Sequence, residues 1–250
     1  MFAASERHFV RWRRRVGRLA EMLVDALLPP ACAFCGRPGQ MVCLDCLSAI
    51  QWVREPVCEL CGRPVQGGRC RDCRTNPPAL QTIRSATYYQ DPVKRLVHRF
   101  KYEGLFALSR PLGRLMVEAW PAWERPVDLV VPIPLHSRRR SERGYNQSEL
   151  LVTEMCRHVN LTADNRALTR VRWTQPQLGL TADERRANVH GAFVADPARV
   201  AGKRVLLVDD VCTTGSTLTA AAMALQDAGA LAVRAYCLCT VAARQDIPFE

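Results

Sequence analysis

The stretch "VLLVDDVCTTGSTL", residues 205–218, joins an apolar run to two adjacent acids and then to small hydroxyl residues and a glycine. The apolar residues 205–208 predict a buried strand, so Asp209 and Asp210 stand at its end. The residues that follow predict a turn that opens a helix, and backbone amides and hydroxyls in such a turn can converge on a phosphate. The turn consists of Thr213, Thr214, Gly215, Ser216 and Thr217. Two carboxylates repel a phosphate unless they bind another group, and sugar hydroxyls are suitable donors. The stretch therefore predicts a site for a ribose 5-phosphate.

Two other interpretations of the same residues are weaker. An apolar strand that ends in two acids also occurs at the metal site of ATPases, but no G-x-x-x-x-G-K-[ST] motif precedes it here. A helix cap explains the hydroxyls of Ser216 and Thr217, but it gives no purpose to the two acids or to Gly215. The ribose phosphate interpretation accounts for all of them.

Around this stretch, predicted strands alternate with predicted helices from residue 82 onward. Strands are expected within residues 84–90, 127–135, 191–195, 203–211 and 232–242, and helices within 92–106, 108–120, 146–159 and 217–229. The alternation predicts an α/β domain over residues 82–244, with a mainly parallel sheet and helices on both faces. Ligands of such domains bind beyond the carboxyl ends of the strands.

Eight of the twelve cysteines form two near-repeated groups before this domain. The first group is Cys32, Cys35, Cys43 and Cys46, and the second is Cys58, Cys61, Cys70 and Cys73. Paired Cys-x2-Cys spacing predicts a closed, structural zinc site in each group, within a module of residues 30–76 that needs metal to fold. Two zinc ions are expected, and one occupied site is the alternative. Disulfides compete with zinc, but the chain shows no credible export signal.

The N-terminal residues 1–29 predict a basic, amphipathic helical segment. Apolar side chains recur at helical spacing at Leu19, Met22, Leu23, Ala26 and Leu27, and Pro29 ends the pattern. Glu21 and Asp25 interrupt any signal-peptide core, and no apolar run approaches the roughly 20 residues of a membrane span. A cytoplasmic location is expected, and the helix could pack on a neighbour or lie on the inner face of the membrane or on nucleic acid.

The net charge of +11 attracts polyanions. Because arginine far outnumbers lysine, the excess can also reflect genome composition. The charge therefore allows nucleic-acid binding without establishing it.

Residues 205–218 resemble the phosphoribosylpyrophosphate signature of type I phosphoribosyltransferases. The segments "VVPIPLHSRRRSERGYNQSELL" and "TQPQLGLTADERRANVHGAF", together with the cysteine array, resemble the ComF family of competence and DNA-utilisation proteins over nearly the full chain. The resemblance implies that Asp209 and Asp210 are catalytic acids that hold the ribose hydroxyls, and that residues 213–217 wrap the 5-phosphate. It implies that Mg2+ accompanies the donor. Arg143 and Arg185 match the family patterns RGxNQ and RxxN and are expected to bind the donor.

Further cations lie near the expected site. Arg138, Arg139 and Arg140 are expected in a loop after a strand, where they suit pyrophosphate or nucleic acid, or else form a solvated basic turn. Lys101 is either a further phosphate contact or a solvated helix end.

The resemblance leaves two functions open. In the first, the protein acts in DNA uptake, handles incoming single-stranded DNA alongside a helicase-like ATPase, and binds phosphoribosylpyrophosphate. In the second, it is an active phosphoribosyltransferase whose acceptor is a base, an amine or a nucleic-acid-linked group. We favour DNA uptake with donor binding retained, and the sequence does not decide whether the donor is consumed.

Overall fold

The computed structural model describes residues 30–121, 126–174, 184, 188–189 and 191–241. The predicted helical segment 1–29 and Arg185 lie outside these residues. The chain forms two compact units, Met1–Ser48 and Ala49–Glu250, which divide between the two cysteine groups. The boundaries expected at residues 30–76 and 82–244 stay predictions. Among the described residues, no helix combines the length and apolar character that crossing a membrane requires.

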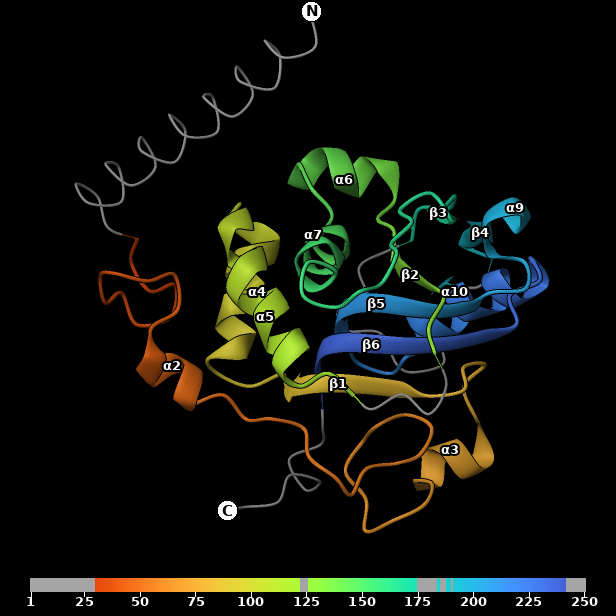
Figure 1. Cartoon of the computed structure of the whole chain (residues 1–250), viewed down its shortest axis with the longest axis horizontal. Coiled ribbons are helices and arrows are strands. Elements are labelled where there is room, and N and C mark those ends of the chain that lie inside the picture. The colour runs from red at the N-terminus through yellow and green to blue at the C-terminus, as the bar shows by residue number, and fades with distance from the viewer. Residues whose placement is uncertain (1–29, 122–125, 175–183, 185–187, 190, 242–250) are drawn as a thin grey trace, which may run out of the picture. The chain divides into compact units, whose positions relative to one another are not determined.

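The larger unit is built on a four-stranded sheet (Figure 1). Its strands are β1 (Ile83–Tyr88), β2 (Leu129–Pro132), β5 (Arg204–Cys212) and β6 (Ala232–Thr240), in the spatial order β1-β6-β5-β2. All three neighbouring pairs are parallel, as the alternating pattern predicted. The central strands β5 and β6 are buried along nearly their whole length, which explains their continuous apolar sequence.

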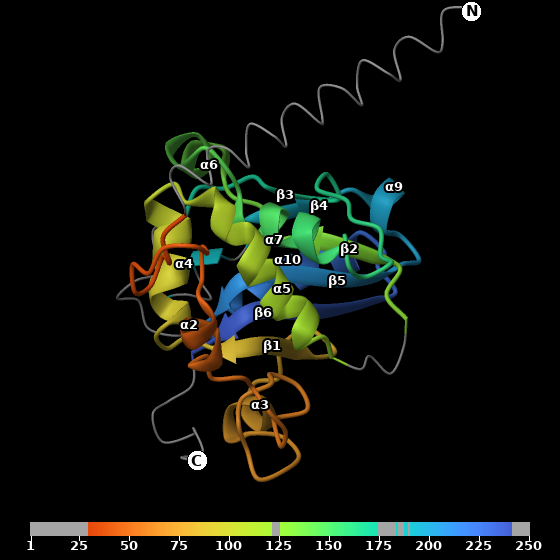
Figure 2. The ribbon, with the colours of Figure 1, turned by 60° about the vertical axis from the view of Figure 1, so that its left-hand side comes forward.

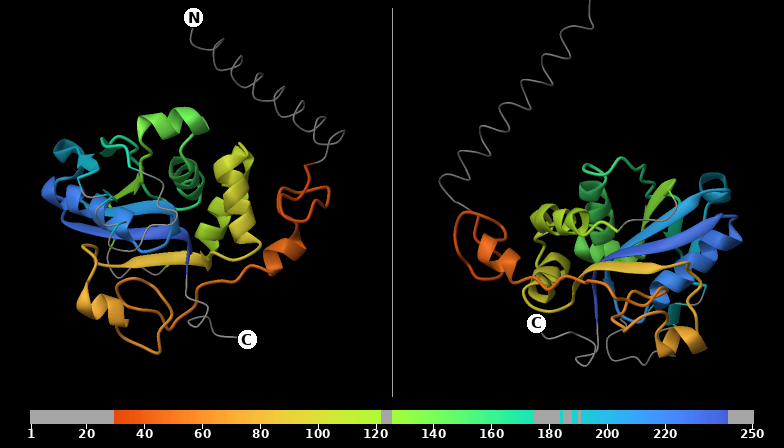
Figure 3. Two further views of the ribbon diagram at one scale, coloured as in Figure 1. Left: turned by 180° about the vertical axis from the view of Figure 1, so that it is seen from behind. Right: turned by 60° about the horizontal axis from the view of Figure 1, so that its bottom comes forward.

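Helices cover both faces of this sheet. On one side lie α4 (Val93–Tyr102), η1 (Phe106–Leu108), α5 (Ser109–Glu118) and α7 (Gln147–Met155) (Figure 2). On the other side α10 (Ser216–Asp227) buries Leu218, Ala221 and Leu225 against Val205 and Val233 of the sheet. Figure 3 shows the sheet from behind and from below. The predicted architecture of a parallel sheet between helical layers is confirmed.

Five further short elements are described in this unit. These are α3 (Arg71–Thr75), α6 (Ser137–Arg143), α9 (Pro197–Val200) and a two-stranded antiparallel sheet of β3 (Leu168–Arg170) and β4 (Phe193–Ala195). The sequence predicted β4 but not β3, because a strand of three residues shows no clear alternation. In the smaller unit, α2 (Leu44–Ser48) follows the third cysteine of the first group.

The segment that carries the second cysteine group is joined to the edge of the sheet at β1. Trp52 forms an antiparallel bridge with Thr87, and the Val53 amide donates to the Ala86 carbonyl over 3.0 Å. The Ile83 amide donates to the Leu60 carbonyl over 2.6 Å. Backbone hydrogen bonds therefore hold this segment against the domain.

The helices α5 and α7 pack closely at Gly113. A methyl group at this position would come within 2.7 Å of Cβ of Glu154, which is buried on α7. The close approach of the two helices thus depends on a residue without a side chain.

Substitution of Gly113 by Ala should lower the free energy of unfolding by about 1–2 kcal/mol, because the clash outweighs the better helix propensity of alanine. Urea denaturation measures this change. Arg114→Ala, an exposed substitution in the same helix, should stay within about 0.5 kcal/mol of the wild type. Equal stability of the two variants would contradict the packing described here.

Candidate functional site

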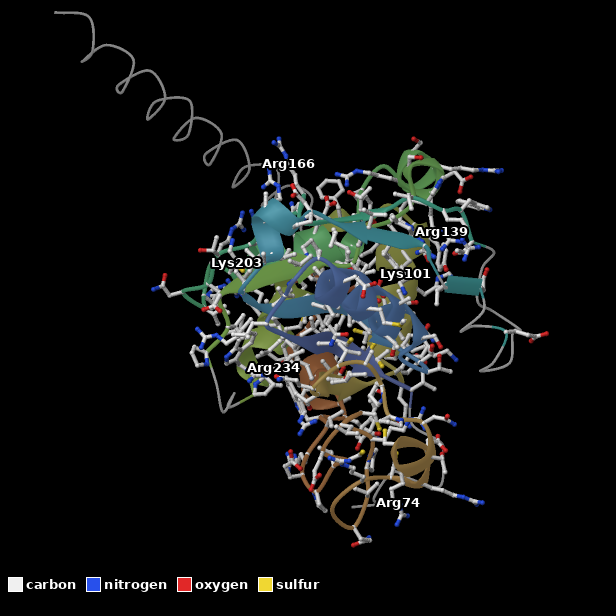
Figure 4. All side chains as sticks on the ribbon, turned by 90° about the vertical axis from the view of Figure 1, so that its right-hand side faces the viewer. Arg74, Lys101, Arg139, Arg166, Lys203 and Arg234 are labelled. Carbon is white, nitrogen blue, oxygen red and sulfur yellow. The ribbon has the colours of Figure 1, made fainter. Side chains whose placement is uncertain are left out.

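A cavity of about 810 Å³ opens at the carboxyl ends of β5 and β2. Its lining contains many of the residues expected from the sequence, namely Lys101, Arg139, Arg143, Asp209, Asp210, Thr213, Gly215, Ser216 and Thr217. Thr214 lines a neighbouring cavity. Figure 4 shows Lys101 and Arg139 on one side of the domain and Arg74 at the far end of the second cysteine segment. The topology thus brings together residues that are more than 100 positions apart.

The two acids have different partners. Asp210 is buried and forms an ion pair with Lys101 on α4, with 2.8 Å between Nζ and Oδ1. Asp209 accepts a hydrogen bond of 3.0 Å from the Ser148 hydroxyl at the start of α7. Lys101 is therefore neither a solvated helix end nor an isolated phosphate ligand, because its ammonium group lies against Asp210.

This arrangement changes how the acids ionise. Burial, followed by the neighbouring Asp210 carboxylate, raises the pKa of Asp209 to about 7. Burial would lower the pKa of Lys101, but the Asp210 carboxylate more than offsets it and raises the pKa above its usual value. Since the pKa of Asp209 is higher in the folded than in the unfolded chain, its contribution to stability is lost as the pH rises from about 4 to about 7. Near neutral pH, Asp209 is poised between its acid and carboxylate forms.

The loop of residues 213–217 leads directly into α10. Gly215 has φ +75° and precedes the first helical residue, a conformation that other residues rarely adopt. The hydroxyls of Thr214 and Ser216 lie 2.7 Å apart. Because this loop is the N-terminus of a 12-residue helix, its amides and the helix dipole favour an anion.

The arginines at 138–140 do not lie in a loop, and that expectation was wrong. They belong to α6, which begins where His136 accepts a hydrogen bond from the Arg138 amide and ends at Gly144, whose φ is +82°. The caps at both ends explain why a helix forms here.

The helix α6 separates its three arginines. Arg138 and Arg139 place their guanidinium groups 4.9 and 5.2 Å from the ring centre of Trp173. Arg140 is paired with Glu149, including a hydrogen bond of 2.9 Å from Nη2. Of the three, Arg139 lines the cavity.

Two buried hydrogen-bond donors lie beside the cavity, and sequence reasoning missed one of them, Arg170. Gln147 is only 1% exposed, and Arg143 donates to its Oε1, which fixes the amide orientation. Within the described part of the chain, Gln147 Nε2 and Arg170 Nε are buried without a hydrogen-bond partner. Burial, followed by the charge of Arg139, lowers the pKa of Arg170. Unsatisfied donors are costly, so this wall of the cavity suits a ligand rich in oxygen. Gln147 belongs to the RGxNQ pattern, whereas Arg170 is the last residue of a strand too short to recognise from the sequence.

Both cysteine groups have the geometry of a zinc site. Within each group all four sulfur atoms lie within 4.8 Å of one another. The Cys35 and Cys43 sulfurs are 3.6 Å apart, as are those of Cys61 and Cys70. Four sulfurs at about 2.3 Å from one zinc would show this separation, whereas a disulfide needs about 2.05 Å. The cysteines of each group are consecutive in the sequence, as expected, and their geometry supports one structural zinc site in each group.

Comparison with known proteins agrees with this geometry. A family model described as "Phosphoribosyl transferase domain" matches residues 148–248, and one described as "Double zinc ribbon domain" matches residues 23–74. DNA utilization protein YhgH of Salmonella typhi is 35% identical over 175 residues, which cover 68% of this chain and 77% of the relative. This chain belongs to the ComF family. Competence protein F of Haemophilus influenzae is 34% identical over 167 residues, covering 64% and 73%, and competence protein ComFC of Bacillus subtilis is 29% identical over 207 residues, covering 79% and 72%.

In this ComF protein the matched phosphoribosyltransferase region includes Ser148, both acids and the loop 213–217. It leaves out Lys101, Arg139 and Arg143, which line the same cavity. The site is therefore completed by segments that precede the matched region.

Loss of either partner of the Lys101–Asp210 pair alone should lower the free energy of unfolding more than loss of both together. Lys101→Met leaves a buried carboxylate without a counter-charge and should cost about 3 kcal/mol of unfolding free energy. The double variant with Asp210→Asn should recover most of this loss, since it removes both charges. Urea denaturation at pH 8 measures the wild type, Lys101→Met, Asp210→Asn and the double variant.

The control is Lys94→Met, which changes an exposed lysine on the same helix and should cost less than about 0.5 kcal/mol. Additive losses at Lys101 and Asp210 would show that the pair does not stabilise the fold.

Proposed function

We propose that this ComF protein handles incoming single-stranded DNA in DNA uptake, and that its phosphoribosyltransferase-like domain binds phosphoribosylpyrophosphate with Mg2+. The observation that carries donor binding is the shared cavity, which joins Asp209 and Asp210 to the loop 213–217. The names of its relatives support the role in DNA uptake. A cytoplasmic location goes with this function, because zinc sites of four cysteines need reduced thiols.

The donor is assigned to the cavity by its chemistry. The 5-phosphate takes the loop at the N-terminus of α10, where backbone amides and hydroxyls are available. The ribose hydroxyls face the acids. Asp209 is better placed to accept hydrogen bonds from them, because Asp210 is already paired with Lys101. The pyrophosphate takes the wall formed by Arg139, Arg143, Arg170 and Gln147. Arg185 remains a predicted donor ligand.

Carboxylates beside a phosphate-binding loop are suitable ligands for magnesium. Asp209 and Asp210 are the residues that would face it. When bound, magnesium neutralises charge on the pyrophosphate and so favours its departure.

The alternative function is an active phosphoribosyltransferase with an unassigned acceptor. The two acids, the loop 213–217 and the arginine-lined wall together support this alternative, since a domain that had lost the reaction would not need to keep all three. If transfer occurs, the acids would help to stabilise positive charge that develops on the sugar.

For DNA, the surface at the start of α6 is the candidate contact. Arginine over an aromatic ring is an arrangement that serves both phosphate binding and base stacking, and Trp173 with Arg138 and Arg139 provides it. A helicase-like ATPase of DNA uptake is the proposed protein partner, by analogy with the family.

Calorimetry should show that the protein binds phosphoribosylpyrophosphate with Mg2+, and that affinity rises about tenfold between pH 6 and pH 8 as Asp209 loses its proton. The ionised Asp209 accepts hydrogen bonds from the sugar hydroxyls better than the protonated side chain does. Asp209→Asn should bind more weakly and lose this pH step, and Asp209→Asn with Asp210→Asn should abolish binding.

Magnesium pyrophosphate, titrated over the same pH range, is the control for ionisation of the ligand's own phosphates. Full affinity of the double Asn variant would refute the donor site.

Binding of an oligothymidine to the protein should weaken with rising salt and on substitution of Trp173 by Ala, by about 1–3 kcal/mol if one base stacks there. Arg138→Ala with Arg139→Ala should reduce the salt slope as well. Arg74→Ala, an exposed arginine far from Arg139, is the matched control (Figure 4). Fluorescence anisotropy measures each affinity, and equal losses at all three sites would remove the case for this surface.

A further inference from the structure

A second cavity of about 750 Å³ lies behind the phosphate loop. The second cysteine segment contributes Cys61, Arg63 and Asp72 to its lining, and the loop and α10 contribute Thr214 and Ser216. Ser216 also lines the donor cavity, so the loop 213–217 separates the two spaces. The loop is thus approached by a residue of the cysteine segment from the side that faces away from the acids.

Arg63 is fixed in this place by close backbone packing. Gly62 has φ +69°, and a methyl group there would come within 2.6 Å of the Ile83 carbonyl oxygen. The Ile83 side chain continues to the loop, where its Cδ1 would lie 3.3 Å from a methyl group on Gly215. A single residue of β1 therefore touches both the turn before Arg63 and the phosphate loop.

The first cysteine group provides an internal comparison. Both groups carry the sequence Cys-Gly-Arg-Pro, and in both the arginine donates through Nη1 to an aspartate that precedes the last cysteine. The side chain of Arg37 is 59% exposed, whereas that of Arg63 is 30% exposed. The Arg–Asp pair is therefore common to both cysteine groups, whereas the greater burial of the arginine is found in the second group.

The charge of Arg63 reaches the start of the phosphate loop. The pKa of the Cys212 thiol is lowered first by a hydrogen bond from Cys237, and the positive charge of Arg63 contributes in the same direction. Cys212 is followed directly by Thr213, the first residue of the loop.

The loop itself holds no cation, although a 5-phosphate carries up to two negative charges. Among the cations that line the donor cavity, Lys101 is paired with Asp210, and the arginines of α6 and β3 are assigned to the pyrophosphate. Among the described residues that line the second cavity, Arg63 is the cation beside Thr214 and Ser216.

We propose that Arg63, carried by the second cysteine segment, stabilises the 5-phosphate of the donor in the loop 213–217. This inference rests on the proposed donor site. One donor group of Arg63 is bonded to Asp72 at 2.6 Å, and its guanidinium retains further N–H groups for the phosphate side. The second zinc ribbon would then contribute a residue to donor binding, whereas the first would not.

Calorimetry with two partial ligands, ribose 5-phosphate and magnesium pyrophosphate, isolates this role. Arg63→Gln should bind ribose 5-phosphate about tenfold more weakly and change pyrophosphate binding less than about twofold, because a positive charge beside the loop is lost at the phosphate end only. Arg63→Lys should restore much of the loss. Arg37→Gln, the same change in the first group, should bind both ligands as the wild type does.

Asp72→Asn gives a test of opposite sign. Removing the competing carboxylate should strengthen binding of ribose 5-phosphate by about two- to threefold, which a purely structural role of the pair would not do. Zinc per chain, measured for every variant, should stay at the wild-type value.

The outcomes separate the two claims. Wild-type affinity for ribose 5-phosphate in Arg63→Gln, with zinc retained, overturns the role of Arg63 and leaves the donor site standing. If Arg63→Gln loses zinc, Asp72→Asn decides, and unchanged or weaker binding with zinc retained overturns the proposal. Failure of the wild-type protein to bind ribose 5-phosphate or the full donor refutes the donor site instead.

Discussion

Two adjacent carboxylates at the buried end of β5 impose the constraint on which the site depends. Burial and a neighbouring negative charge both disfavour ionisation of a carboxyl group. The fold reduces this cost by giving each of the two acids a different partner. Asp210 is neutralised by Lys101 from α4, while Asp209 takes a hydrogen bond from Ser148 and retains a proton up to near pH 7. Lys101 near the end of α4 and Ser148 at the start of α7 therefore both direct polar groups to these acids of β5.

The sequence predicted the parts of the structure that follow from local pattern. The apolar run of β5, the small residues of the loop and the cysteine spacing each reflect a requirement within a short segment, and each appears as expected. The alternation of strands and helices likewise determined the sheet, because a parallel sheet needs a crossover between its strands.

What the sequence did not predict depends on contacts between distant segments. Lys101 pairs with a residue 109 positions away, and no pattern near Lys101 announces this partner. Arg170 and Trp173 gain their roles from the placement of β3 beside α6, and β3 is too short to recognise. The helix α6 was taken for a loop because its polar, arginine-rich sequence has no apolar face, and its caps at His136 and Gly144 are single residues.

The contact of Ile83 with both Gly62 and Gly215 has a consequence for how the protein can evolve. A side chain at Gly62 would press on the backbone carbonyl of Ile83, and a larger side chain at Ile83 would press on Gly215 in the loop 213–217. Substitutions at Ile83 and Gly215 are therefore not independent, whereas Gly62 is restricted by the backbone of β1 whatever side chain stands at position 83.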